Sequence, residues 1–267
     1  MAARAPATLS AAGIPALECR AVDVEVAGRG LVRGLDFTAE GGRFIAVLGR
    51  NGVGKSLTLH TLAGLRAPAA GSVRLDGREL SAWGGRERAR RLALLPQLTE
   101  DPFPSTVLET ALIGRHPHLA FWQWEEAADF ASARAALAAV GLGTLAERAV
   151  DSLSGGERRR LDIATLLAQD AAVCLLDEPT NHLDPRHRND MLALFRSRAD
   201  AGGLVIAALH DPTLAARAAD LALLLFGDGR WRFGPAATIL SDANLSELYE
   251  VPVGELAWRG QRVFVSA

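Results

Sequence analysis

The feature that most constrains this chain is a glycine-rich loop between an apolar run and a helix-forming stretch. It matches the pattern G-x-x-x-x-G-K-[ST] in full and reads Gly49-Arg50-Asn51-Gly52-Val53-Gly54-Lys55-Ser56, followed by Leu57. Glycines let such a loop wrap closely around phosphate with its amide hydrogens inward, and the helix N-terminus behind it adds partial positive charge. A glycine-rich turn that only starts a helix is the alternative, but the full match in this setting favours a nucleotide site.

Two side chains of the loop carry specific expectations. Lys55 would supply a cation to the β- and γ-phosphates, and Ser56 would supply a hydroxyl to Mg²⁺. Lys55 is the only lysine among 29 basic residues, and all the others are arginine. Because lysine is a compact point charge and arginine a broad planar fork, the sequence indicates that a guanidinium will not serve at this position.

The apolar runs predict a mainly parallel sheet flanked by helices. Phe44–Leu48, Ala171–Leu176 and Leu204–Leu209 are continuous apolar runs of strand length, which is typical of strands buried on both faces. A helix is expected after the glycine-rich loop, and the strand–loop–helix rhythm returns after residue 171. Ligands of such α/β folds bind beyond the carboxyl ends of the strands.

Other segments depart from this rhythm. Residues 17–48 read as strands, and Ser72–Leu75 with its Asp-Gly turn predicts a hairpin at a sheet edge. Between about 98 and 165 strand signals give way to Ala-rich helical segments, notably Val107–Gly114 and Ala127–Val140, so we expect a helical insertion. Residues 1–16 are rich in Ala and Pro and are expected to form a flexible tail before a domain over 17–267.

Two adjacent carboxylates follow the second of these strands. Asp177 and Glu178 come directly after Val173–Leu176. Asp177 is placed to hold Mg²⁺, and Glu178 is placed to polarise an attacking water as a general base. A solvated acidic loop is the alternative, but two neighbouring carboxylates in one site repel each other unless a cation is present, and the phosphate loop upstream provides the reason for one.

A second glycine-containing helix start lies shortly before the acidic pair. It reads Leu153-Ser154-Gly155-Gly156-Glu157, with Ser154 as a helix N-cap. Together with the phosphate loop and the acidic pair, this segment closely resembles the signature of the ABC ATPase family, and the resemblance covers the chain from about Leu17 onward. The implied fold is a phosphate-loop NTPase with a mainly parallel sheet, an antiparallel N-terminal β subdomain and an inserted helical subdomain.

The resemblance assigns roles to further positions. Gln97 is similar to the glutamine that contacts Mg²⁺ and the attacking water, and His210 to the histidine that contacts the γ-phosphate. Asp184, in Asn181–Asp184, is similar to the acidic residue of a segment that communicates across a dimer. Two subunits would pack head to tail, so that Ser154, Gly155, Gly156 and Glu157 of one subunit face the nucleotide on the other.

The resemblance also implies cofactors, partners and location. ATP and Mg²⁺ are the expected ligands, and ATP hydrolysis is the expected activity. A homodimer would sit beneath two polytopic membrane permease subunits at the cytoplasmic face of the inner membrane, supplied indirectly by an extracytoplasmic substrate-binding protein. A net charge of −2 gives no broad basic field, so no nucleic-acid partner is expected. The longest apolar runs fall far short of the roughly 20 residues of a membrane span.

Two aromatic features qualify the resemblance. Many family members stack an aromatic residue on adenine, whereas the corresponding stretch here, Val24–Gly28, has none and offers only Val26, so weaker selectivity between ATP and GTP is expected. Leu57 also stands where the family often has Thr. The aromatic segment Phe121–Trp124 is expected to pack within the helical region, with a protein contact as the alternative.

The cargo is indicated only by weaker similarities. The segments Thr110–His118 and Asn244–Val253 resemble the ATPases of importers for iron chelates, haem and cobalamin. Iron chelates, haem included, are favoured over cobalamin. A soluble ABC ATPase without a membrane partner is the alternative from another class. A module that only binds nucleotide is disfavoured because the complete set of catalytic residues is present.

Overall fold

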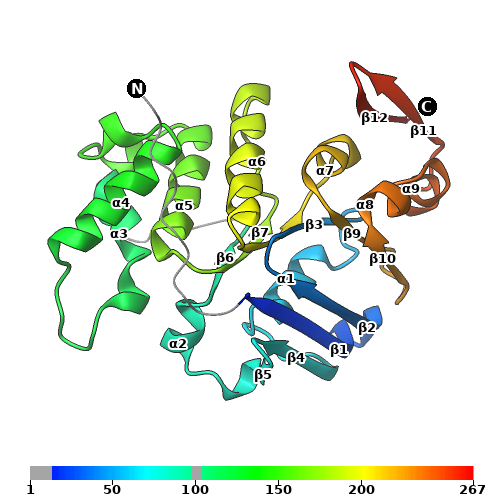
Figure 1. Cartoon of the computed structure of the whole chain (residues 1–267), viewed down its shortest axis with the longest axis horizontal. Helices are drawn as coiled ribbons and strands as arrows, with labels where there is room; N and C mark the ends of the chain where they lie inside the picture. The colour runs from blue at the N-terminus through cyan, green and yellow to red at the C-terminus, as the bar shows by residue number, and fades with distance from the viewer. Residues whose placement is uncertain (1–13, 98–103, 267) are drawn as a thin grey trace.

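The computed structural model describes residues 14–97 and 104–266 (Figure 1). Residues 1–13 of the expected tail and residues 98–103, at the expected start of the helical insertion, lie outside the described residues. The strands are β1 (Ala16–Val26), β2 (Arg29–Glu40), β3 (Arg43–Leu48), β4 (Ala70–Leu75), β5 (Arg78–Glu79), β6 (Leu92–Leu95), β7 (Val173–Asp177), β8 (Leu204–Ala208), β9 (Leu221–Leu225), β10 (Trp231–Pro235), β11 (Val253–Trp258) and β12 (Gln261–Ser266). The helices are α1 (Lys55–Leu62), α2 (Gly85–Ala89), α3 (Val107–Ile113), α4 (Ala127–Ala139), α5 (Gly155–Gln169), α6 (Pro185–Asp200), α7 (Pro212–Ala218), α8 (Ala236–Ile239) and α9 (Asp242–Tyr249).

The central sheet has six strands in the order β10-β9-β3-β8-β7-β6. Strands β9, β3, β8, β7 and β6 run parallel, and β10 pairs antiparallel with β9 at one edge. The three apolar runs chosen from the sequence form β3, β7 and β8, which lie side by side in the middle of this sheet. The prediction of a mainly parallel sheet is therefore confirmed.

The alternation of side chains along these buried strands builds two separate cores. In β3, Phe44, Ala46 and Leu48 belong to one core, while Ile45 and Val47 belong to the other. The same alternation holds in β7 and β8. Because successive side chains of a strand point to opposite faces, a strand covered on both sides must be apolar at every position, which explains the unbroken apolar runs.

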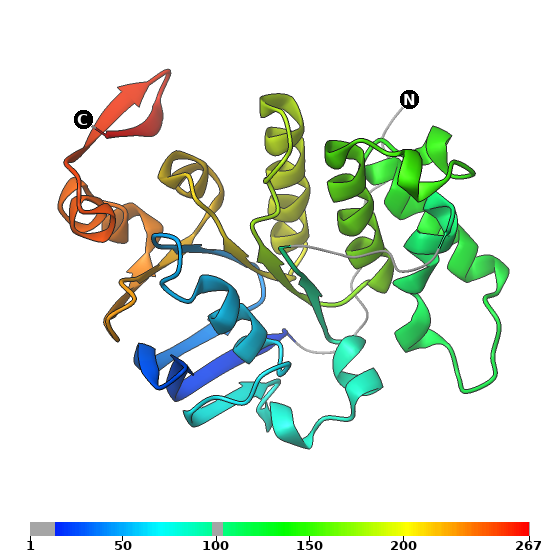
Figure 2. The same ribbon diagram turned by 180° about the vertical axis from the view of Figure 1, so that it is seen from behind.

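Different layers cover the two faces of the sheet. Helices α6 and α7 pack on one face, whereas α1 lies between the other face and the N-terminal strands (Figures 1 and 2). Those strands form a four-stranded sheet in the order β2-β1-β4-β5, antiparallel throughout. The predicted edge hairpin is confirmed, since β4 and β5 flank the Asp76-Gly77 turn at the edge of this sheet.

Helices α3, α4 and α5 pack against one another beside the β6 edge of the central sheet (Figure 1). Helix α3 begins with a capping box, in which the Thr106 hydroxyl accepts from the Glu109 amide at 3.2 Å and the Glu109 carboxylate accepts from the Thr106 amide at 2.7 Å. The expected helices over Val107–Gly114 and Ala127–Val140 are confirmed as α3 and α4.

The expectation that the aromatic segment packs within the helical region is wrong. Phe121, Trp122 and Trp124 are 78%, 88% and 85% exposed, respectively, in the connection before α4. Phe121 and Trp122 stack edge to face on each other, with ring centroids 5.0 Å apart, instead of entering the core. Apolar type alone predicted burial, but the segment lies on a connection that leaves the helical layer.

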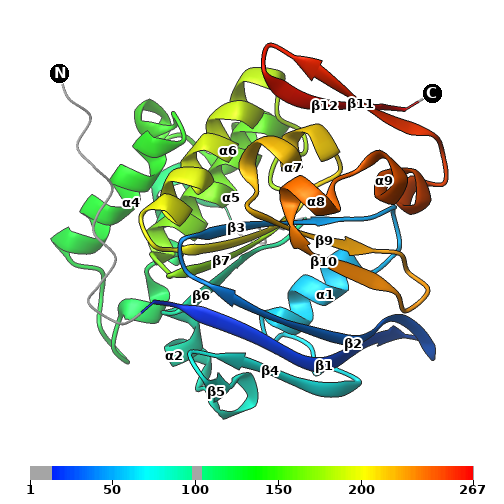
Figure 3. The ribbon, with the colours of Figure 1, turned by 45° about the vertical axis from the view of Figure 1, so that its right-hand side comes forward.

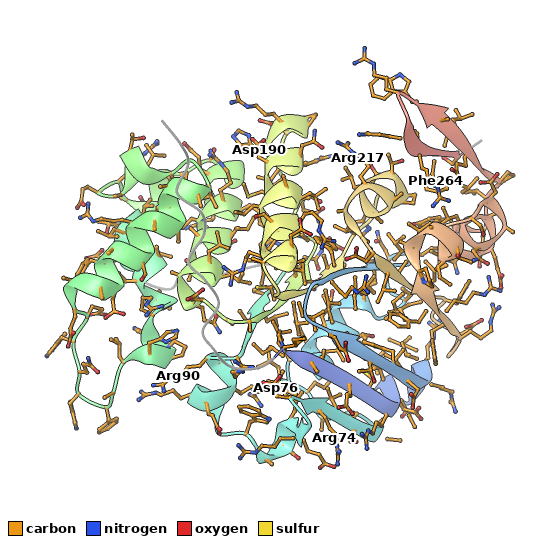
Figure 4. All side chains as sticks on the ribbon, in the orientation of Figure 1. Arg74, Asp76, Arg90, Asp190, Arg217 and Phe264 are labelled. Carbon is orange, nitrogen blue, oxygen red and sulfur yellow. The ribbon has the colours of Figure 1, made fainter. Side chains whose placement is uncertain are left out.

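The C-terminal segment forms an element that the sequence did not predict. Strands β11 and β12 make a separate two-stranded antiparallel sheet. It packs on α7 through β12, where the Phe264 amide donates to the Thr213 hydroxyl at 3.0 Å (Figure 4, which labels Phe264). Among the described residues no helix is both long and apolar enough to cross a membrane.

Candidate functional site

The carboxyl ends of four neighbouring strands converge on one cleft. Strands β6, β7, β8 and β3 lead into Gln97, Glu178, His210 and the glycine-rich loop, respectively. Parallel strands end at the same edge of a sheet, so residues far apart in sequence meet there. The cleft has a volume of ≈ 500 Å³ and is lined by Val26, Leu31, Asn51, Gly52, Gly54, Lys55, Ser56, Leu57, Gln97, Glu178, Asn181 and His210.

The glycine-rich loop has the backbone that its sequence demands. Gly54 is the N-cap of α1 with φ 104, a backbone conformation that residues other than glycine rarely adopt. Gly49 has no room for a Cβ, which would lie 2.6 Å from the Leu225 carbonyl oxygen. Val53 is 5% exposed and packs in the core. Its side chain therefore anchors the loop, while the backbone amides of the loop can bind a ligand.

Lys55 is held inside the loop. Its side chain is buried, and Nζ donates to the carbonyl oxygens of Gly49 at 2.9 Å and Arg50 at 3.2 Å. Burial lowers the pKa of Lys55, and the nearby carboxylates of Glu178 and Asp177 oppose that shift. The ammonium is therefore incompletely compensated by charge, a state that favours an incoming anion.

Glu178 is the point where the cleft residues meet. Gln97 Nε2 donates to Glu178 Oε2 at 3.0 Å, Asn181 Nδ2 donates to the same oxygen, and His210 Nε2 contacts Oε1. The backbone of Glu178 is left-handed, with φ 52. A glutamate in this conformation is strained, and such strain is typical of sites where the surroundings fix a side chain for function.

Asp177 is buried beside Ser56 and the lysine. It is 1% exposed, and neither carboxylate oxygen has a hydrogen-bond partner of ordinary geometry within the described ranges. Burial raises the pKa of Asp177, while the nearby Ser56 hydroxyl acts to lower it. Buried oxygens without partners are costly, so this carboxylate and hydroxyl fit a hard cation that binds through oxygen.

Arg159 is a structural residue of the site that sequence reasoning missed. It is 4% exposed, and its guanidinium donates to the carbonyl oxygens of Pro96 at 2.7 Å, Asp177 at 2.6 Å and Glu178 at 3.0 Å. Arg159 thus ties α5 to the ends of β6 and β7. It stands in a run of three arginines, and the one available signal is that it lies four residues before the buried Ile163, at helical spacing.

We expect Arg159→Met to destabilise the fold by about 3 kcal/mol, because it removes the buried guanidinium that donates to three carbonyl oxygens. Urea unfolding followed by circular dichroism measures the loss. Arg160→Met is the matched control, since the Arg160 guanidinium is hydrogen-bonded to one carbonyl oxygen, that of Val140 at 3.0 Å, and is only partly buried. Equal losses in the two variants would contradict the role of Arg159.

The second glycine-containing helix start lies elsewhere on the chain. Ser154 caps α5 in a capping box, with the Glu157 carboxylate accepting from its amide at 2.9 Å, and this hydrogen bond is the main reason that the pKa of Glu157 is lowered. Asp184 caps α6, accepting from the His187 amide at 2.9 Å. Neither the α5 start nor Asp184 lines the cleft, although Asn181 earlier in the same segment does, and Ser154, Gly155 and Asp184 are exposed.

The two segments are adjacent to each other. A Cβ on Gly156 would lie 3.3 Å from the His182 carbonyl oxygen, so the start of α5 packs against the segment that precedes α6. Within one chain the cleft therefore gathers the phosphate loop, Gln97, Glu178 and His210, whereas it does not gather the α5 start or Asp184. Ser154, Gly155 and Asp184 thus lie on the surface outside the cleft, and the Asp184 carboxylate there is held by the His187 amide and imidazole.

One end of the cleft is apolar. Val26 and Leu31 line it, and Val26 is 41% exposed. The exposed Val26 side chain can contact a planar base without the stacking that an aromatic ring would add, whereas Leu31 is 2% exposed and belongs to the core. The arrangement as a whole provides a phosphate-binding loop, the Asp177 carboxylate for a cation and the Glu178 carboxylate next to the loop.

Comparisons with known proteins agree with the resemblance drawn from the sequence. Residues 32–181 match the ABC transporter family. The chain is 44% identical to a hemin import ATP-binding protein HmuV of Pseudomonas entomophila over 217 residues, 79% of this chain and 84% of that one. It is 40% identical to the HmuV protein of Myxococcus xanthus over 252 residues, 91% of this chain and 93% of that one. Its fold resembles a chain of a solved ABC transporter described as of the metal-chelate type, in an inward-facing conformation, with a TM-score of 0.82, 28% identity and coverage of 95% and 98%.

Proposed function

Because this chain belongs to the ABC transporter family as an ATP-binding subunit, we propose that it hydrolyses ATP to power the import of an iron chelate, with haem as the cargo. The observation that carries the catalytic part is the position of Glu178. Its carboxylate lies in the nucleotide cleft beside the phosphate loop, contacted by Gln97, His210 and Asn181.

The proposed chemistry assigns one role to each cleft residue. The loop amides and Lys55 bind the β- and γ-phosphates of ATP, and Val26 contacts the base. Glu178 accepts a proton from the water that attacks the γ-phosphorus, and its contacts with Gln97 and His210 orient the carboxylate. His210, which contacts Glu178, would bind the γ-phosphate.

Ser56 and Asp177, with Gln97, are the residues that would hold Mg²⁺. The buried oxygens of Asp177, which lack a hydrogen-bond partner of ordinary geometry among the residues that the structure describes, support this assignment. When bound, the ion neutralises charge on the phosphate oxygens. Because Asp177 and Glu178 are adjacent, this division leaves one carboxylate for the cation and the other for the proton.

We propose that the working unit is a head-to-tail homodimer. The exposed helix start Ser154–Glu157 and the exposed Asp184 would face the γ-phosphate held by the other copy. Their location outside the cleft of their own chain supports this arrangement. A helix N-terminus binds an anion through bare amides and its dipole, so each ATP would lie between two such termini and would close the dimer.

The homodimer would act beneath two membrane permease subunits, as a peripheral protein at the cytoplasmic face of the inner membrane. An extracytoplasmic binding protein would deliver the cargo to the permease. Two relatives that are described as hemin import ATP-binding proteins, at 44% and 40% identity, support haem over cobalamin. The inserted helical region around α3, α4 and α5 is the proposed separate subdomain within the domain over 17–267.

We expect affinity purification of the tagged chain in mild detergent to recover a polytopic membrane protein, identified by mass. In vesicles reconstituted with that partner and its binding protein, ATP should drive entry of haem, while cobalamin and a ferric siderophore should not enter. Recovery of soluble partners alone, with ATPase activity stimulated by nucleic acid, would favour a soluble ABC ATPase. Entry of cobalamin in place of haem would overturn the cargo.

A further inference from the structure

The C-terminal end of α9 contacts the nucleotide site at two points. The Tyr249 hydroxyl donates to the backbone carbonyl oxygen of His210 at 3.3 Å, and the Glu250 carboxylate forms an ion pair with the Arg50 guanidinium. Arg50 is the second residue of the phosphate loop, and His210 contacts Glu178. Figure 3 shows α9 beside the connection from β3 to α1.

Helix α9 is held in place by core packing and by hydrogen bonds to neighbouring elements. Leu245 and Leu248 are buried in the core, and Glu247 accepts from Arg230 on the β9–β10 connection and from Arg232 on β10. The Ser246 hydroxyl accepts from the Val253 amide at 2.9 Å, which closes the chain just beyond the helix. Tyr249 and Glu250, which contact the site, therefore lie at the end of a helix whose position is fixed.

The backbone of Glu250 indicates that its side chain matters. It has φ 59, the left-handed conformation that usually ends a helix with glycine. A residue with a side chain is disfavoured in this conformation. The strained backbone coincides with a carboxylate that pairs with Arg50 of the phosphate loop, and strain of this kind is often found at functional sites.

The ion pair itself contributes little to stability. Arg50 and Glu250 side chains are 41% and 65% exposed, and exposed pairs are weak because solvent screens them. Tyr249, by contrast, packs against the core, and burial together with nearby Asp211 raises the pKa of its phenol, so the hydroxyl stays a donor. Both contacts fix position more than they stabilise the fold.

We propose that Tyr249 and Glu250 are positioning residues for ATP hydrolysis. Tyr249 holds the backbone of His210, and thereby the imidazole against Glu178, while Glu250 holds the phosphate loop through Arg50. The two contacts affect different steps of the ATPase reaction. The His210 contact acts on the hydrolytic step, and the Arg50 contact acts on nucleotide capture, because a loop that is ordered in advance loses less entropy on binding.

The test rests on the proposed ATPase function and separates the two effects in the purified chain. Tyr249→Phe removes only the hydroxyl, and we expect kcat to fall about fivefold while the half-saturating ATP concentration stays constant. Glu250→Gly suits the left-handed backbone, so we expect an unchanged or raised Tm with a roughly threefold higher half-saturating ATP concentration, as expected for the loss of one exposed ion pair.

Glu255→Gln is the matched control in the C-terminal sheet. It weakens the ion pair with Arg262, which touches neither α9 nor the cleft, so kcat and the half-saturating ATP concentration should stay constant. If Tyr249→Phe and Glu250→Gly leave both kinetic constants unchanged, or change them only as Glu255→Gln does, the proposal is wrong. A wild-type chain without ATPase activity would instead sink the proposed function, so the two failures are distinguishable.

Discussion

Glu178→Gln is expected to bind ATP with at least the affinity of the wild-type chain and to hydrolyse it at least about 100-fold more slowly. A positioned general base contributes about 10²- to 10⁴-fold to a rate, and an amide cannot accept the proton. Glutamine keeps the size of the side chain and an oxygen that can accept from Gln97, which is 3.0 Å from the carboxylate in the structure. Removing a negative charge next to the γ-phosphate site also reduces repulsion, so ATP binding should tighten.

Phosphate release under saturating ATP, together with equilibrium binding of ATP, measures both halves of this expectation. Glu109→Gln is the matched control, because Glu109 is an exposed carboxylate in the capping box of α3, where glutamine also caps. The control should retain full activity. If Glu178→Gln keeps more than a tenth of the wild-type rate, the assignment of the base is wrong, whereas loss of ATP binding would indicate a role in holding nucleotide.

The parts of the site that sequence reasoning located are those whose signal is local. The phosphate loop needs its glycines at fixed offsets, because Gly54 is left-handed and Gly49 lies against the Leu225 carbonyl. Glu178 and His210 could be placed because each follows an apolar run that had to be a strand buried on both faces. The convergence of strand ends then brought them together without any knowledge of distances. Their catalytic roles remain predictions.

The features that could not be predicted from the sequence depend on contacts between distant segments. Arg159 stands in a run of charged residues, and its burial is determined by three carbonyl oxygens that chain folding delivers. Strand β10 (Trp231–Pro235) carries a glycine and a proline, which disfavour strand structure, and it exists because it pairs with β9. The contact of Tyr249 with His210 joins residues 39 apart and has no periodic signature.

Lys55→Arg is expected to weaken ATP binding at least about 100-fold, although the charge is retained. The Lys55 ammonium occupies a buried position where Nζ donates to two loop carbonyls at 2.9 and 3.2 Å. A planar guanidinium is wider than this enclosure and cannot rotate its donors between the carbonyls and a phosphate. Hydrogen bonds to a charged group contribute about 1.5–3 kcal/mol each, so the loss of one or two corresponds to that factor.

The distribution of cations gives this expectation a control within the same chain. Arginine replaces lysine at every other basic position. The reverse change at an exposed site, Arg20→Lys, should therefore leave ATP affinity unchanged, since Arg20 pairs only with the neighbouring Glu18 at 2.7 Å among its contacts in the described chain. Titration of both variants with ATP decides the matter. If Lys55→Arg binds ATP within about threefold of the wild type, charge alone suffices in the loop, and the single lysine is not explained by its compact shape.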